Sequence, residues 1–469
     1  MKQLVAIICV ISAFFSCSSK QNSCGQAFIG GEIINPNNDY LVLYDDSSPI
    51  DTLYLDENNR FSHKIESLNS GLHSFIHGGE YQVVVIEPND SIMIRLNTLD
   101  FDESLVFSGK GSKKNNFLID LFVKLEKEDK YMYEFSKLPP IEFQEKIDSL
   151  KKGKVKNLKK FTEKYPSSNL FSKVANASIN YSYFTHKELY PFRYYGNNNL
   201  INRKNLPKDF YNYRKHIDYN DQDLKDFYPY YNFLFPHINN LALDKYFEKT
   251  KDTVFNVNSI HYNLNKLELM DSLVYSDAIK NNLLKYATRN FLSHSNSINE
   301  CEEMYQSYIN KSTSKEDSNY ITSLFETSKR LQPGNRLPDV EIINSKNETI
   351  NINAIIEKPT VVYFWSNASK YHFKNSHKKV KALKREFPDI DFVSVNINAN
   401  NASVWKRILK QNKFSVEGEY RFRNPHFAKK QLAINYIRKV LVIDKNSKII
   451  SSNSDLFDSE FKYILNKLK

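Results

Sequence analysis

Residues 360–379 read TVVYFWSNASKYHFKNSHKK, and this stretch decides how the last part of the chain is interpreted. The run 361–365 is entirely apolar or aromatic, as in a strand that is buried on both faces. A polar turn follows, and residues 369–387 then show helical spacing with many lysines. The stretch therefore predicts a buried strand, a loop and a basic helix.

Further strands and helices are expected on both sides of this unit. They are a hairpin at 340–343 and 349–352, a strand at 391–397, a helix at 402–411, a hairpin at 439–444 and 448–451, and a helix at 456–468. This order predicts an α/β domain over residues 333–469. Its boundary lies at 331–338, LQPGNRLP, because glycine and proline interrupt regular structure.

The motifs of this domain resemble the TlpA-like thioredoxin family. The resemblance rests on the apolar strand that ends in Phe364-Trp365, and on the spacing of Gly334 and Pro338-Asp339 before it. It implies a thioredoxin-like fold of the TlpA/AhpC type. It also implies thiol–disulfide oxidoreductase activity through a Cys-x-x-Cys motif at the start of the helix.

The positions of that motif carry no cysteine. Ser369 stands at the first cysteine, His372 at the second, and Arg438 at the cis-proline that faces the pair in the family. Disulfide exchange needs an attacking thiolate and a second thiol that resolves the mixed disulfide. We therefore predict no catalytic residues. Trp365, Lys370 and Arg438 are predicted to bind a partner, because the rim is basic and favours anions.

Two other chemistries were weighed at these positions. Ser369 and His372 are close enough on a helix start to form a nucleophile–base pair, but no orienting group or oxyanion hole is indicated. His372 and His377 are five residues apart and do not share a helix face as metal ligands would. We interpret both histidines as surface residues and predict no metal and no cofactor. Ser369 is expected to cap the helix.

Residues 1–16 read as an export signal, with Lys2 before an apolar run at 4–15 that is too short to span a membrane comfortably. The run ends in Ser16-Cys17, which resembles the lipobox of bacterial lipoproteins and implies lipidation of Cys17. Residues 17–25 would be a tether. The alternative is an ordinary signal peptide cut elsewhere. We expect an envelope protein anchored in a membrane, with the periplasmic side of the outer membrane favoured.

Cysteine usage fits an oxidising compartment without requiring a disulfide. Cys17, Cys24 and Cys301 remain after signal cleavage, and no two cysteines have Cys-x-x-Cys spacing. The envelope permits disulfides, so a bridge between Cys24 and Cys301 stays open.

Residues 26–110 alternate short apolar runs with turn signals and predict an antiparallel β-sandwich. They resemble the β-domain that precedes thioredoxin domains in many exported lipoproteins, where it would be a spacer or a binding module. Residues 111–332 are predicted to be helical, with apolar spacing at 118, 121, 122 and 125. The aromatic-rich segment 181–235 is interpreted as helical core, with a sugar- or peptide-binding surface as the alternative.

The formal net charge is +11, from 65 Lys+Arg and 54 Asp+Glu spread along the chain. Without a clustered stripe or a binding motif, this charge does not indicate nucleic-acid binding. We expect a multidomain envelope protein whose degenerate thioredoxin-like domain binds a protein or peptide. The alternative is a thiol–disulfide oxidoreductase with a non-standard site, such as Cys301.

Overall fold

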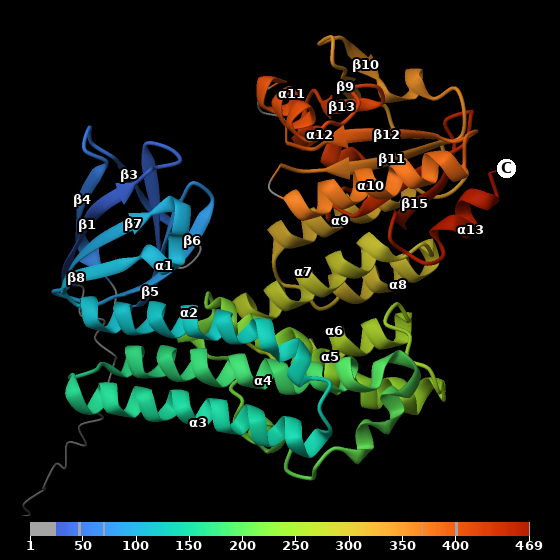
Figure 1. Cartoon of the computed structure of the whole chain (residues 1–469). Coiled ribbons are helices and arrows are strands. Elements are labelled where there is room, and N and C mark those ends of the chain that lie inside the picture. Colours follow the sequence, from blue (N-terminus) through green and yellow to red (C-terminus); the bar gives the residue numbers. More distant parts are fainter. Residues whose placement is uncertain (1–24, 46–47, 69–70, 368, 399–401, 469) are drawn as a thin grey trace, which may run out of the picture. The chain divides into compact units, whose positions relative to one another are not determined.

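A computed structural model describes residues 25–45, 48–68, 71–367, 369–398 and 402–468 (Figure 1). The predicted signal peptide, Cys17 and Cys24 lie outside these residues. The chain divides into two compact units, which are described separately. The first is Met1–Lys187, Pro207–Tyr211 and Asp221–Phe233, and the second is Glu188–Leu206, Asn212–Asn220 and Leu234–Lys469. The predicted domain boundaries at 110 and 332 stay predictions.

Two four-stranded sheets open the first unit, with strand orders β4-β1-β7-β8 and β3-β2-β5-β6. The strands are β1 (Gly25–Ile34), β2 (Tyr40–Asp45), β3 (Ser48–Tyr54), β4 (Arg60–Leu68), β5 (Gly71–His77), β6 (Glu80–Ile86), β7 (Ser91–Asn97) and β8 (Val106–Lys110). Alternating residues from both sheets, such as Ile29, Leu43 and Ile94, share one hydrophobic core. Burial of alternate side chains is what the period-two pattern of the sequence predicts.

One strand pair in these sheets is not antiparallel. β1 pairs with β7 in parallel, with Phe28 opposite Ser91 and Ile34 opposite Asn97. The prediction of a purely antiparallel module is wrong on this point. A parallel pair needs a long crossover, and here strands β2 to β6 supply it.

The helices of the first unit include α1 (Phe101–Ser104), which follows the short 3₁₀ turn η1 (Thr98–Asp100), and then α2 (Ser112–Phe135), α3 (Pro140–Lys164) and α4 (Asn169–Asn199). Pro140 is the first residue of α3, where its missing N–H costs nothing. Rings of α2, α3 and α4 meet in one cluster: Phe117, Phe161 and Phe171 have centroids 4.6 to 5.7 Å apart. The aromatic content of the middle region therefore includes interhelical core.

Helices also make up the first part of the second unit. They are η2 (Leu200–Asn205), η3 (Asn212–His216), α6 (Ile260–Leu273), α7 (Asp277–His294), α8 (Ile298–Ile309) and α9 (Lys315–Arg330). The short η4 (Gln222–Leu224) belongs to the first unit, and α5 (Tyr228–Thr250) begins in the first unit and continues into the second. Their core holds a fully buried carboxylate, Glu188, 2.7 Å from Nδ1 of His237. Burial opposes ionisation of Glu188, but the bond to His237 and the charge of Arg214 outweigh it and lower its pKa. Within the segment 181–235, Tyr190 of this unit and Tyr230 of the first unit are both 0% exposed, which confirms the core interpretation for these aromatic residues.

A mixed seven-stranded sheet with order β10-β9-β13-β12-β11-β14-β15 forms the C-terminal part of the second unit. Its elements are β9 (Glu341–Ile343), β10 (Thr349–Asn351), η5 (Ile352–Ile355), β11 (Thr360–Trp365), α10 (Lys370–Glu386), β12 (Asp391–Asn396), α11 (Ala402–Gln411), β13 (Glu419–Phe422), α12 (Pro425–Gln431), β14 (Lys439–Ile443), β15 (Ile449–Asp455) and α13 (Phe461–Asn466). This is the expected strand–helix order, with β13 and α12 in addition. The closing helix is shorter than predicted.

Strand β11 lies inside this sheet, parallel to β12 and antiparallel to β14. All six of its residues are buried. On one face, Val361 and Tyr363 pack with Val380 of α10 and Phe461 of α13. This burial on both sides explains why the run 361–365 lacks polar residues.

The predicted boundary at 331–338 is held against the C-terminal hairpin. The N–H of Gly334 donates to the carbonyl of Ile449 at 2.7 Å, and that of Leu337 to Ser447 at 2.8 Å. Arg336 forms an isolated antiparallel bridge with Lys448. The segment is thus integrated into the edge of the sheet and is not an open linker.

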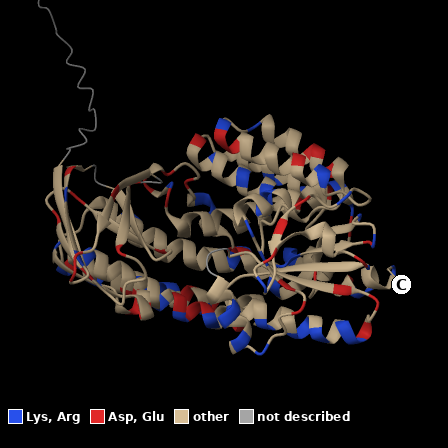
Figure 2. Ribbon diagram, turned by 90° about the horizontal axis from the view of Figure 1, so that it is seen from above, with Lys and Arg blue, Asp and Glu red and all other residues tan. Residues whose placement is uncertain are grey.

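Both basic and acidic residues are scattered over the elements that Figure 2 shows. This matches the interpretation of the net charge as spread along the chain. The described helices include none that is long and apolar enough to cross a membrane.

Candidate functional site

The candidate site lies where β11 passes into α10, as the sequence predicts. Ser369 occupies the N-cap position of α10, and the N–H of Phe373 donates to its carbonyl at 3.1 Å. The Ser369 side chain makes no capping hydrogen bond, so the expectation that it caps the helix through its hydroxyl is wrong. The helix forms because Phe373, His377 and Val380 recur at helical spacing and are buried.

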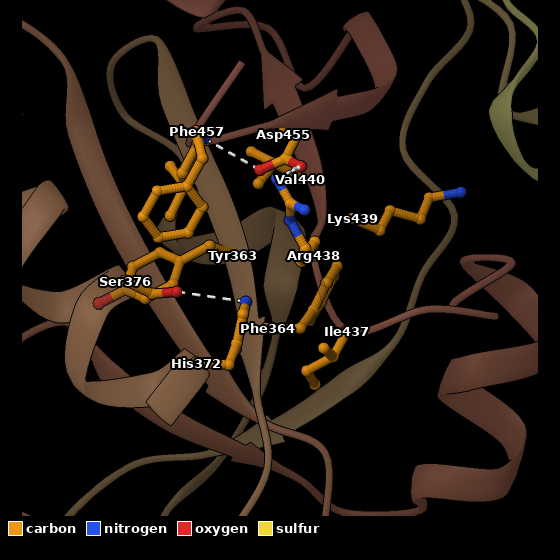
Figure 3. A pocket seen from close by; sticks show the side chains of 11 residues that line it. Tyr363, Phe364, His372, Ser376, Ile437, Arg438, Lys439, Val440, Asp455 and Phe457 are labelled. Atoms are coloured by element: carbon orange, nitrogen blue, oxygen red, sulfur yellow. Dashed lines mark hydrogen bonds and ion pairs between the residues drawn. The ribbon is translucent and has the colours of Figure 1, made fainter. Parts of the chain in front are cut away.

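His372 lies in the first turn of α10 and lines a small cleft together with Arg438, the residue just before β14 (Figure 3). Its Nε2 is 3.2 Å from the hydroxyl of Ser376, one turn further along the helix. Its Nδ1 is buried and has no hydrogen-bond partner. Burial, followed by the positive charge of Arg438, lowers the pKa of His372. The imidazole is therefore neutral near pH 7.

This arrangement does not support a Ser369–His372 hydrolytic pair. The hydroxyl that contacts His372 belongs to Ser376, which is 0% exposed and cannot reach a substrate. A nucleophile must be accessible as well as close to its base.

Arg438 lies across this small cleft from His372 (Figure 3). Its guanidinium forms an ion pair with Asp455 of β15 at 2.6 Å and lies 5.7 Å from the ring centroid of Phe457. Asp455 also accepts the backbone N–H of Phe457 at 2.9 Å (Figure 3). Arg438 is thus held over the cleft by a neighbouring strand.

The cleft is closed. Its lining includes Tyr363, His372, Ile437, Arg438 and Phe457, and there is no room in it for a water molecule. Neither Ser369 nor His372 carries a thiol, and the space between His372 and Arg438 is filled.

The loop before β14 is held by helix α7 of the same unit. The side chain of Asn435 donates to Ser293 at 2.9 Å, and Asn453 of β15 donates to the carbonyl of Ser295 at 2.9 Å. Between them, the ring of Tyr436 stacks on His294 at a centroid distance of 4.4 Å. These contacts restrain the segment that carries Arg438.

The three residues that the sequence analysis predicts to bind a partner differ in their exposure to solvent. Lys370 is exposed at the start of α10, and the side chain of Arg438 is 55% exposed. Trp365 is 0% exposed and packs on Phe373, so its prediction as a binding residue is corrected to a core residue. A side chain that is excluded from solvent cannot touch a partner at the surface.

His377 is not the surface residue that the sequence analysis expects. It is buried, with its Nε2 2.9 Å from Oε1 of Glu419 on β13, and its ring stacks on Phe414 at 4.1 Å. Its Nδ1 lies 2.7 Å from the carbonyl of Phe373. The signal that could have revealed this burial is the spacing from Phe373 to His377 and Val380, which places the histidine on the apolar face.

Lys439 is a second buried polar residue that the sequence analysis missed. Its Nζ donates to the carbonyl of Ala433 at 3.1 Å, and burial lowers its pKa to about 7. In Figure 3 its side chain points away from His372. It occupies a strand position, and nothing in its local sequence distinguishes it from an exposed lysine.

Cys301, the alternative redox residue, is a free thiol on α8 and is 0% exposed. Burial raises the pKa of this thiol, which disfavours the reactive thiolate. Among the described residues, no cluster of histidine, cysteine and carboxylates has the arrangement of a metal site.

No protein-family model and no curated protein matches the chain. Solved structures do match. A Bacteroides vulgatus protein named as a thiol–disulfide oxidoreductase is 20% identical over 30% of this chain and 99% of its own, with a TM-score of 0.28. The C-terminal domain of another, from Bacteroides thetaiotaomicron, is 17% identical over 30% and 97%, with a TM-score of 0.25. A Cytophaga hutchinsonii domain named as one of a possible thiol–disulfide isomerase is 19% identical over 29% of this chain and 92% of its own, with a TM-score of 0.26.

Proposed function

We propose that the chain is a lipoprotein of the cell envelope whose C-terminal thioredoxin-like domain has lost redox chemistry and serves as a binding or scaffold module. One observation carries this proposal: residues 333–469 contain no cysteine, and Ser369 and His372 occupy the two positions at the start of α10 where the family has thiols. Neither side chain can attack a disulfide or resolve one. The closed cleft between His372 and Arg438 supports the same interpretation.

The alternative is a thiol–disulfide oxidoreductase that uses Cys301. Its thiol is fully buried on α8, and its pKa is raised by burial. Reactive cysteines instead have lowered pKa values and partial exposure. The environment of Cys301 is that of a structural thiol, which makes this alternative the weaker one.

The proposed binding surface is the rim of the cleft and not its interior. We assign to this rim Arg438 and Phe457, which line the cleft, and Lys370 and Tyr371, which are exposed just before His372 at the start of α10. The side chain of Tyr371 is 84% exposed. Aromatic and arginine side chains are enriched at protein interfaces, where they contribute much of the binding energy. The partner would be a protein or peptide with acidic residues beside an apolar one. The contacts of α7 with the loop 435–436 would keep the rim in one conformation.

The remaining parts of the proposal follow from the sequence. Lipidation of Cys17 would anchor the protein at the periplasmic side of a membrane, and the two N-terminal sheets would form a β-sandwich that holds the other parts away from the anchor. Stable anchoring by acyl chains needs no membrane-spanning helix. The proposal involves no metal and no cofactor.

Site-specific crosslinking in intact envelopes tests the binding surface. A photoreactive phenylalanine at position 371 should crosslink to a partner protein, and Lys370→Glu should weaken this product because it reverses the rim charge. The same photoreactive residue at position 463, an exposed tyrosine of α13, is the matched control. Equal crosslinking at both positions, or none at 371, would contradict a partner at the rim.

A further inference from the structure

The first unit encloses a cavity of about 600 Å³ that belongs to neither the candidate site nor the proposed partner surface. Five elements contribute to it: the start of β6, helices α1, α2 and α4, and the segment that opens α5. Cavities that bind small organic molecules have volumes of about 300 to 1,000 Å³. The cavity is therefore large enough for a ligand of the size of a dipeptide.

The sequence explains why this space is open. Along α4, Ser178 and Ser182 stand between Val174 and His186 at steps of four residues, so that small side chains line the middle of the stripe. Opposite them, α2 contributes the apolar residues Leu118, Phe122 and Leu125. Helical spacing places each set on one face of its helix. The result is an apolar floor beside small hydroxyl-bearing residues.

The cavity is acidic although the chain as a whole is basic. Glu80, Asp102, Glu126 and Asp129 line it, and the described lining contains no lysine or arginine. Burial, followed by the charge of Glu126, raises the pKa of Asp102, which shows that these carboxylates repel one another. A cation in the cavity would relieve this repulsion.

His186 supplies an independent sign of a ligand. Its side chain lines the cavity and is 8% exposed. Its Nε2 pairs with Asp129 at 2.8 Å, while its Nδ1 has no hydrogen-bond partner. A buried polar atom without a partner is costly and needs an explanation, such as a water molecule, an ion or a ligand that completes its bonding.

Aromatic side chains surround the acidic groups. Tyr81, Phe122 and Tyr228 line the cavity and remain exposed, and Phe227 is buried beside them. The face of an aromatic ring attracts ammonium and guanidinium groups. We propose that this cavity binds an organic cation, an amine or guanidinium group on a mostly apolar body, and that the four carboxylates and the aromatic residues recognise it.

Calorimetric titration of the full mature chain in detergent tests this proposal with matched ligands. N-acetyl-phenylalanyl-arginine amide carries the cation and the apolar group, and its citrulline analogue has nearly the same shape without the charge. We expect the arginine compound to bind at or below about 1 mM and the citrulline compound about ten-fold more weakly. Phenethylamine serves as the free small amine. Binding of phenethylamine alone assigns the site to free amines, and binding of the dipeptide alone assigns it to a peptide segment.

Substitution of the lining carboxylates tests whether the ligand binds in this cavity. Glu126→Gln and Asp102→Asn should each weaken the arginine compound by about three- to five-fold. Asp120→Asn, on the exposed side of α2 and outside the lining, should change the affinity by less than about two-fold. Equal affinity for the arginine and citrulline compounds, equal effects of the cavity and control variants, or no binding of any cation at about 1 mM would overturn the proposal.

Discussion

Replacement of Glu419 by alanine would test the interpretation of His377 as a buried, paired side chain. Nε2 of His377 lies 2.9 Å from Glu419 and its Nδ1 lies 2.7 Å from the carbonyl of Phe373, so both ring nitrogens face acceptors. Each ring nitrogen of His377 therefore has a hydrogen-bond partner, and Nε2 has Glu419 as its partner. Glu419 is 5% exposed, so this contact is buried inside the domain.

The expected loss in Glu419→Ala follows from this geometry. Glu419→Ala leaves Nε2 of His377 buried without this partner, while Nδ1 keeps its contact with the carbonyl of Phe373. A buried polar atom that loses its partner costs about 1–3 kcal/mol. We expect the free energy of unfolding to fall by about 1–3 kcal/mol.

Glu341→Ala is the matched control. This glutamate lies on β9, beside β13, and pairs with Arg423 at 2.9 Å, but both side chains are more than half exposed. Exposed pairs contribute about 0–1 kcal/mol. The double variant His377→Leu with Glu419→Leu should recover part of the loss, because two apolar residues leave no buried polar atom without its partner.

Tryptophan fluorescence during urea unfolding of the mature chain is the assay. The two tryptophans, Trp365 and Trp405, are both buried beside Phe373 of α10, so the signal reports on the domain that contains the pair. A loss in Glu419→Ala no larger than that in Glu341→Ala would refute the interpretation.

Three further predictions concern the anchor, the degenerate motif and a buried lysine. Cys17→Ala should abolish labelling by a fatty-acid probe and release the protein from membranes; continued labelling would contradict the lipobox interpretation. Ser369→Cys combined with His372→Cys should create a reducible disulfide, detected by mass spectrometry after alkylation, while turnover stays low because the pair of Arg438 with Asp455 closes the cleft. For Lys439, burial lowers the pKa from 10.5 to about 7, so the unfolded chain binds more protons between these values and stability should rise with pH across that window. Lys439→Met should increase stability at pH 7 and flatten this rise in the fluorescence assay; an unchanged slope would contradict the assignment.

The sequence predicts the elements around the candidate site because their patterns are strong. The apolar run 361–365 and the lysine-rich helix after it correspond to β11 and α10 within one residue at each end. Burial on both faces is matched by the apolar and aromatic run 361–365 of β11, and the helix has one apolar stripe. The positions of Ser369, His372 and Arg438 follow from this frame.

β13, by contrast, could not be predicted from periodicity. Its sequence is Glu419-Tyr420-Arg421-Phe422, yet it lies inside the sheet between β9 and β12. Glu419 can be buried in this strand because its carboxylate contacts His377, which is 42 positions away in the chain. A pairing of this kind depends on tertiary contacts that no local pattern encodes.

The acidic cavity of the first unit was missed for a similar reason. Asp129 and His186 are 2.8 Å apart although they lie on different helices, α2 and α4. Each helix alone has an ordinary mixture of polar and apolar residues. Only the tertiary packing of β6, α1, α2, α4 and the start of α5 brings the carboxylates, the histidine and the aromatic rings to one space.

Turnover of a disulfide substrate by the wild-type chain tests the central claim most directly. Insulin reduction with a thiol reductant should proceed at the uncatalysed rate, because residues 333–469 contain no cysteine and Cys301 is buried. Cys301→Ala should give the same rate as the wild type. Robust wild-type turnover that is lost in Cys301→Ala would contradict the binding-module account and establish the oxidoreductase alternative.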